Sequence, residues 1–148
     1  MPKDSDEKQA VKTVLPPYSG QPVLGLALGS GLARGFAHIG VIRTLHRHGI
    51  YPDIVAGASI GSLVGGCYLA GQLDDLEEWG LSLTRMKIFA LLDFKMRDAG
   101  LIGGHKLKGL LKQQMTKLNI EDLPRPFISI ATDLVTGHEV WLRKGNLI

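Results

Sequence analysis

The chain has 148 residues, of which 45% are hydrophobic and 21% are charged, and its formal net charge is +3. This length suits one domain with a sizeable core, and the composition excludes a chain that is disordered throughout. The single cysteine, Cys67, excludes an internal disulfide framework and a multi-cysteine metal site, which fits a reducing compartment.

Positive charge gathers in the C-terminal half of the chain. Residues 1–22 sum to zero, residues 23–84 to −2 (3 Lys/Arg minus 5 Asp/Glu) and residues 85–148 to +5 (11 Lys/Arg minus 6 Asp/Glu). Such an excess can face an anionic lipid surface or nucleic acid, but lysines at this density more often only keep a face solvated. We therefore expect no nucleic-acid partner.

The first 22 residues read as a polar, mostly disordered leader that ends in Pro16, Pro17, Gly20 and Pro22. This leader has no apolar stretch of the kind that a secretory signal needs, so we expect a cytoplasmic protein, with peripheral membrane contact left open. The folded domain is expected over residues 23–148.

A strand, a helix and a second strand open this domain. Residues 23–29 are a short apolar run stopped by glycines, residues 33–49 have apolar positions at helical spacing, and residues 51–59 are a second apolar run. A right-handed crossover of this size makes the two strands parallel. The fold class is therefore α/β with a mostly parallel sheet.

Further helices and a hairpin follow. Residues 60–73 predict a helix rich in small residues, residues 74–86 an amphipathic helix with acidic residues at its start, and residues 104–118 a surface helix. Between them, residues 85–104 mix apolar and basic side chains; packing on the core is favoured over contact with lipid. "RPFISIATDL" and "HEVWLRKG" predict two paired strands.

Residues 54–73 form an uncharged stretch of twenty residues, long enough in principle to span a bilayer. The spacing of Gly57, Gly61 and Gly65 would also suit the packing of membrane helices. A buried strand followed by a helix is the better interpretation, because the stretch begins with β-branched residues and contains a Gly-Ala-Ser turn.

The main candidate motif is Gly57-Ala58-Ser59-Ile60-Gly61, which fits the G-x-S-x-G nucleophile elbow between a strand and a helix. The residues two before and two after the serine must be small so that the turn closes. The serine hydroxyl then stands at the carboxyl edge of the sheet, where the positive end of the helix dipole stabilises developing negative charge. Ser59 is the predicted nucleophile.

A second glycine loop, from Gly29 to Gly35, ends the first strand. Parallel neighbours place their C-terminal loops on one sheet edge, so the amides of this loop are candidates for an oxyanion hole beside the serine. The alternative is a dinucleotide cradle with Asp53 as the ribose ligand, although Arg34 stands where the third glycine of that fingerprint belongs.

Together, "LALGSGLARGFAHIGVI", "DIVAGASIGSLVGG" and "FISIATDLVTGHEVWLRKGNL" closely resemble the bacterial patatin-like phospholipases, particularly a small cytoplasmic group described as regulatory. The resemblance implies a three-layer α/β fold that ends here before its C-terminal part. It also implies a serine acyl hydrolase with a Ser–Asp dyad and neither metal nor cofactor. The oxyanion loop of the family falls on Ser30, Gly31 and Leu32 after Gly29, with the arginine of the motif at Arg34.

The dyad aspartate is the main departure. In the family it lies in a D-G-G or D-G-A motif beyond this segment, and no Asp-Gly pair occurs in the 148 residues. Asp53 is expected at the wrong edge of the sheet, and Asp133 matches a segment of the family without being its catalytic aspartate. The histidines are expected to be structural or exposed; His46 and His48 in particular are expected to face solvent.

These observations predict a lipid carboxylic-ester hydrolase that acts through Ser59. This chain alone is expected to be slow or inactive because its base is missing. The alternative is a regulatory protein that holds a lipid in the same pocket without turnover. Exposed parts of an incomplete sheet could also pair two copies of the chain.

Overall fold

The computed structural model describes residues 15–17, 24–82 and 118–148. The described elements are β1 (Gly25–Leu28), the 3-10 helix η1 (Leu32–Phe36), α1 (Ala37–Arg47), β2 (Ile54–Ala58), α2 (Ile60–Leu69), α3 (Leu73–Ser82), the 3-10 helix η2 (Ile120–Asp122), β3 (Phe127–Thr132) and β4 (Glu139–Leu142). Most of the predicted leader, the segment 85–104 and the predicted helix 104–118 except for its last residue lie outside the described residues. Leu15 of the leader packs against the core.

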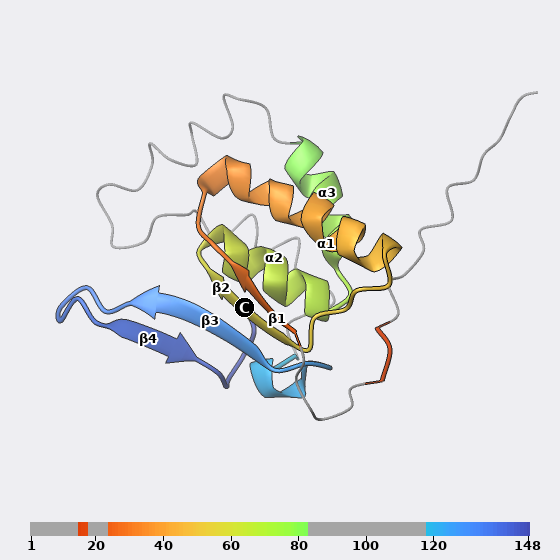
Figure 1. Ribbon diagram of the computed structural model, residues 1–148. Coiled ribbons are helices and arrows are strands. Elements are labelled where there is room, and N and C mark those ends of the chain that lie inside the picture. Colours follow the sequence, from red (N-terminus) through yellow and green to blue (C-terminus); the bar gives the residue numbers. More distant parts are fainter. Residues whose placement is uncertain (1–14, 18–23, 83–117) are drawn as a thin grey trace, which may run out of the picture.

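The four strands form one sheet in the order β1-β2-β3-β4 (Figure 1). β1 and β2 are parallel, β2 and β3 are parallel, and β3 and β4 pair as the antiparallel hairpin that the sequence predicts. The prediction of an α/β fold with a mostly parallel sheet is confirmed. Because β1, β2 and β3 run in the same direction, their carboxyl ends meet at one edge.

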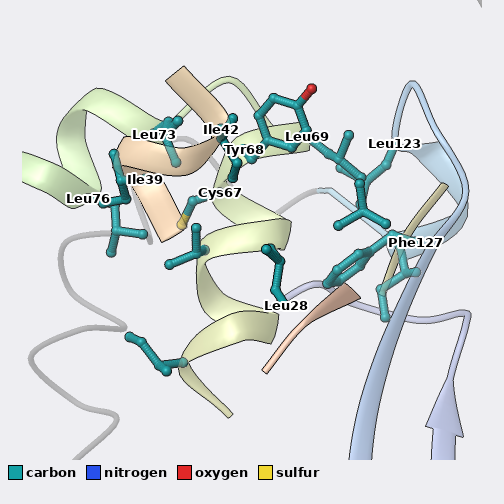
Figure 2. Packing of buried hydrophobic residues seen from close by; sticks show 14 residues of the cluster. Leu28, Ile39, Ile42, Cys67, Tyr68, Leu69, Leu73, Leu76, Leu123 and Phe127 are labelled. Carbon is teal, nitrogen blue, oxygen red and sulfur yellow. The ribbon is translucent and has the colours of Figure 1, made fainter. Parts of the chain in front are cut away.

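α1, α2 and α3 lie on the same face of the sheet (Figure 1). The buried side chains between them form one cluster, to which the strands contribute Leu28, Val55 and Phe127 (Figure 2). Opposite them, Ile42 of α1 and Leu76 of α3 are fully buried. Each such side chain contributes about 1.5–3 kcal/mol by leaving water, so this cluster holds the helices on the sheet.

α1 begins after η1 and ends where the sequence predicts. Gly49 adopts φ +70°, the left-handed conformation that commonly terminates helices. On the outer surface, Arg43 of α1 contacts Asp74 at 2.6 Å and Glu77 at 2.5 Å, which joins α1 to α3. All three side chains are partly exposed, so this pairing orients the helices more than it stabilises them.

The small residues of α2 serve contact with the sheet. A Cβ at Gly65 would lie 3.0 Å from the Phe127 ring and 3.1 Å from Val55, so the helix sits close on β2 and β3. The uncharged stretch 54–73 is thus a strand, a turn and a helix of ten residues. Among the helices in the described part of the chain, none has the length and apolarity to cross a bilayer.

Cys67 of α2 is 1% exposed and lies within the buried cluster. Burial raises the pKa of its thiol to about 12, and the nearby Asp75 carboxylate acts in the same direction. The thiol is therefore neutral and shielded in the folded protein.

The prediction that His46 faces solvent is wrong. Its Nε2 lies 2.8 Å from the Tyr68 hydroxyl, and its ring centroid is 4.6 Å from that of Tyr51 and 5.3 Å from that of Tyr68. His46 follows the buried Ile42 by four residues, which places it on the core-facing side of α1. There Tyr51, in the loop before β2, and Tyr68 of α2 lie beside it. Partial burial there lowers the pKa of His46.

This lowered pKa predicts a pH dependence of stability. Between the folded and unfolded pKa values of His46, the unfolded chain binds more protons, so the free energy of unfolding should fall as the pH drops below about 6.5. His46→Phe keeps a ring at this position and should flatten this dependence between pH 5 and 7. Urea unfolding at several pH values measures it, with His48→Gln at an exposed neighbouring position as the control. An unchanged slope in His46→Phe would contradict the assignment.

Candidate active site

Ser59 stands at the junction of β2 and α2. It follows the last residue of β2, precedes the first residue of α2 and is exposed. Its backbone adopts φ 55° and ψ −123°, a conformation that costs a residue with a side chain of the order of 1–3 kcal/mol. The serine therefore sits on the strained turn that the G-x-S-x-G spacing predicts.

The two glycines of this motif are required by backbone contacts. A Cβ on Gly57 would lie 2.5 Å from the carbonyl of Gly61, and a Cβ on Gly61 would lie 2.1 Å from the carbonyl oxygen of Leu28. Real side chains do not approach so closely. The first turn of α2 is thus pressed onto the ends of both β2 and β1.

Hydrogen bonds behind the turn hold it in shape. The Ser62 hydroxyl donates to the Gly57 carbonyl at 2.6 Å, and the Ser129 hydroxyl of β3 donates to Ser62 Oγ at 3.0 Å. The amides of Ser62 and Leu63 donate to the Ser59 carbonyl. The strained residue is therefore fixed from the strand, the helix and the neighbouring strand.

The glycine loop after β1 lies beside this turn. The Ser30 hydroxyl is 3.4 Å from the carbonyl oxygen of Ala58, the residue before Ser59. A Cβ on Gly61 would also meet the Gly29 carbonyl oxygen at 2.7 Å. The expectation that the two glycine-rich segments meet at one sheet edge is confirmed by these contacts.

Leu32 occupies a strained position in this loop. It adopts φ 49°, in the left-handed region that glycine occupies without strain, and its side chain is 50% exposed. The Arg34 amide closes the turn onto the Gly31 carbonyl at 3.0 Å. The loop thus keeps its turn at some conformational cost, with the Arg34 side chain exposed.

Gly35, the last residue of the loop, is a glycine because it packs against α2. A Cβ there would lie 2.1 Å from the Ile60 side chain, so η1 packs directly on the first residue of α2. This contact fixes the loop against the helix whose N-terminus faces Ser59. The first amides of a helix lack partners within the helix and, with its dipole, favour negative charge.

Asp53 is not placed to act as a base for Ser59. It precedes β2, and the strand separates it from the serine by about 20 Å at 3.3 Å per residue. Its carboxylate accepts a hydrogen bond from the Leu24 amide at 3.1 Å, before the start of β1. The expectation that Asp53 lies at the wrong edge of the sheet is confirmed.

Asp133 lies at the carboxyl end of β3, on the same edge as Ser59, but it is engaged in its own turn. Its Oδ1 accepts hydrogen bonds from the Thr136 amide at 3.0 Å and the Val135 amide at 2.8 Å. These bonds lower the pKa of the carboxyl group. A carboxylate held in this way shapes the β3–β4 turn and is a weaker base.

At this edge of the sheet, His38 makes a contact that the sequence does not reveal. His38, the second residue of α1, places Nε2 2.9 Å from the Gly29 carbonyl oxygen. His48 and His138 are exposed, and His105 lies outside the described residues. Among residues 15–17, 24–82 and 118–148, no group of three potential ligands is suited to a metal ion.

The dinucleotide interpretation does not fit this geometry. In a dinucleotide fold the α-helix opens directly at the glycine loop, and the acidic ribose ligand follows the second strand. Here the five residues of η1 intervene before α1, and Asp53 precedes β2. Ser59 occupies the end of β2 instead.

A serine raised on a strained strand-to-helix turn, beside a glycine loop at the carboxyl edge of a parallel sheet, defines an α/β protein with the geometry of a serine hydrolase. The sequence model of the patatin-like phospholipase family matches residues 26–145, which include both glycine segments. The chain belongs to this family.

Curated relatives agree with this membership. An uncharacterised NTE family protein of Mycobacterium tuberculosis is 43% identical over 129 residues, which cover 87% of this chain and 36% of that protein. A patatin-like phospholipase domain-containing protein of Caenorhabditis elegans is 38% identical, over 84% of this chain and 10% of its own length. The neuropathy target esterase sws of Drosophila persimilis is 32% identical, over 77% and 8%. The chain thus spans about a third, or less, of these relatives.

The contact between Gly61 and Leu28 gives a first prediction for the site. Gly61→Ala should reduce the free energy of unfolding by about 3 kcal/mol or more, because a backbone carbonyl must move to admit the methyl group. Gly40→Ala in α1 is the matched control: its methyl group meets nothing within 4 Å, and it should stabilise the helix by up to about 1 kcal/mol. Urea unfolding compares the two variants. Equal effects would contradict the close approach of α2 to β1.

Proposed function

We propose that this chain carries the nucleophile and oxyanion loop of a serine acyl hydrolase that cleaves carboxylic esters of lipids. The observation that supports it most directly is the strained backbone of Ser59 between β2 and α2, with the glycine loop against the same turn. Membership of the patatin-like phospholipase family supports the choice of lipid esters.

The proposed reaction passes through an acyl-enzyme. The Ser59 oxygen attacks the ester carbonyl carbon while its proton passes to a base, and the carbonyl oxygen becomes an oxyanion. Amides of residues 29–32 and of the first turn of α2 stabilise this charge; each such donor contributes on the order of 3 kcal/mol. Collapse expels the alcohol and leaves an ester on Ser59, which water then cleaves to the acid and the free serine.

We propose that the base is supplied by a part of the protein other than these 148 residues. The resemblance to the family assigns this role to an aspartate followed by glycine, and the 148 residues contain no such pair. Asp53 and Asp133 are engaged elsewhere. General-base assistance contributes about 100- to 10,000-fold in rate, so we propose that this chain alone is slow or inactive.

A lipid substrate also implies an encounter with a surface. We propose peripheral contact with a membrane for which the mixed apolar and basic residues 85–104 are the sequence candidate. Pairing of two copies through an exposed part of the sheet is a second proposal about partners. For residues 85–104 themselves, packing on the core remains the favoured interpretation.

The alternative is a regulatory protein that holds a lipid at the same site without turnover. In that protein the turn at Ser59 would shape a pocket without forming an acyl-enzyme. Reactivity of Ser59 in the longest natural chain that contains these residues separates the two functions.

A fluorophosphonate probe with peptide mass spectrometry makes this test. In the longest natural chain we expect one modified residue, Ser59, and none after Ser59→Ala, while Ser82→Ala, at an exposed position in α3, should react like the wild type. The 148-residue chain should react at least about 100-fold more slowly because it lacks the base. A folded long chain that stays unmodified would overturn the hydrolase and favour the lipid-binding alternative.

A further inference from the structure

We infer that His38 is a positioning residue that locks the Gly29–Ser30 peptide of the oxyanion loop in the orientation that stabilises negative charge. The inference deepens the proposed hydrolase and rests on it for its catalytic meaning. The lock itself is a structural property that can be measured separately.

The contact joins the start of α1 to the loop that precedes it. His38 Nε2 lies 2.9 Å from the Gly29 carbonyl oxygen, and the His38 side chain is only partly exposed. A carbonyl oxygen only accepts, so Nε2 carries the hydrogen of this bond. The neutral Nε2–H tautomer supplies this hydrogen.

The loop needs such a lock because its glycines leave the backbone free to rotate. Gly29 has open space where a Cβ would be, and Gly31 follows after one residue. A trans peptide is planar, with its carbonyl and its N–H pointing in opposite directions. Rotation of the Gly29–Ser30 peptide would exchange the directions of its carbonyl and its N–H. A carbonyl oxygen would then take the place of the N–H that donates to the oxyanion.

His38 fixes one end of this peptide, and other contacts fix its surroundings. The Gly29 oxygen also lies against Gly61, where a Cβ would meet it at 2.7 Å, and the Ser30 hydroxyl reaches the Ala58 carbonyl at 3.4 Å. The latter distance is long for a hydroxyl hydrogen bond. The bond from His38 is the short one, so it sets the direction of the Gly29 carbonyl and, through the peptide plane, that of the Ser30 N–H.

The same bond separates this role from general-base catalysis. A base must offer an unprotonated nitrogen to the serine, whereas Nε2 donates its hydrogen to Gly29. A glutamine at position 38 can place an amide N–H near the position of Nε2 but cannot act as a base. His38→Gln therefore preserves the lock and removes any basicity.

The experiment compares the wild type with His38→Gln and His38→Phe in the longest natural chain that contains these residues, with His48→Phe at an exposed position as the control. Thermal unfolding first identifies the folded variants. Fluorophosphonate labelling of Ser59 should be about three- to tenfold slower in His38→Phe, the range expected for loss of one hydrogen bond. His38→Gln and His48→Phe should react within twofold of the wild type.

A second measurement reports on the peptide directly and does not depend on catalysis. ¹⁵N relaxation dispersion at Ser30 and Gly31 should show microsecond-to-millisecond exchange in His38→Phe and none in the wild type or in His38→Gln.

The outcomes are distinct. Slow labelling in His38→Phe with rescue by His38→Gln supports the lock, whereas equal labelling in all variants, or a glutamine variant as slow as phenylalanine, overturns it. If the wild type itself fails to react at Ser59, the proposed hydrolase fails. The dispersion data then decide the lock, since flat profiles in all three proteins overturn it and exchange confined to His38→Phe supports it.

Discussion

The contact between two stretches of main chain, Gly61 at the start of α2 and the Leu28 carbonyl at the end of β1, underlies the whole arrangement of the site. Because no side chain separates them, α2 begins directly over the carboxyl ends of β1 and β2. The chain that leaves β1 must then pass beside the turn at Ser59, and this proximity brings the glycine loop and the serine together. Gly57 and Gly35 extend the same principle, since each admits a neighbour where a methyl group would not fit.

This close packing carries two strained residues. Ser59 and Leu32 both adopt positive φ angles, and neither is glycine. The strain persists because the surroundings overdetermine it: Ser62 bonds the Gly57 carbonyl, Ser129 bonds Ser62, and the buried cluster beneath α2 resists any retreat of the helix. The strained turn therefore depends on the core as much as on its own sequence, and β3 contributes to a site that lies mainly between β1 and β2.

The sequence predicts the parts of this structure that follow from periodicity and from glycine spacing. Residues 23–29, 51–59 and 125–134 alternate with turns in a way that reveals the strands, and Gly57-Ala58-Ser59-Ile60-Gly61 reveals the strained turn. It does not reveal η1, because a short 3-10 helix leaves no periodic pattern. The contacts of His46 with Tyr68 and of His38 with Gly29 are missed for a different reason: each partner comes from another element, and the pattern of α1 alone contains no information about where β1 and α2 will lie.

The neutral, enclosed thiol of Cys67 can report on the rate at which this fold opens. The residue lies in α2, two positions after Gly65, on the helix that covers the ends of β1 and β2. An alkylating reagent reaches the sulfur when α2 separates from its neighbours, and it reacts only once the thiolate can form. The alkylation rate thus measures how often the helices around this sulfur separate, with no label added, and shows whether ligands that occupy the serine edge hold the helical layer closed.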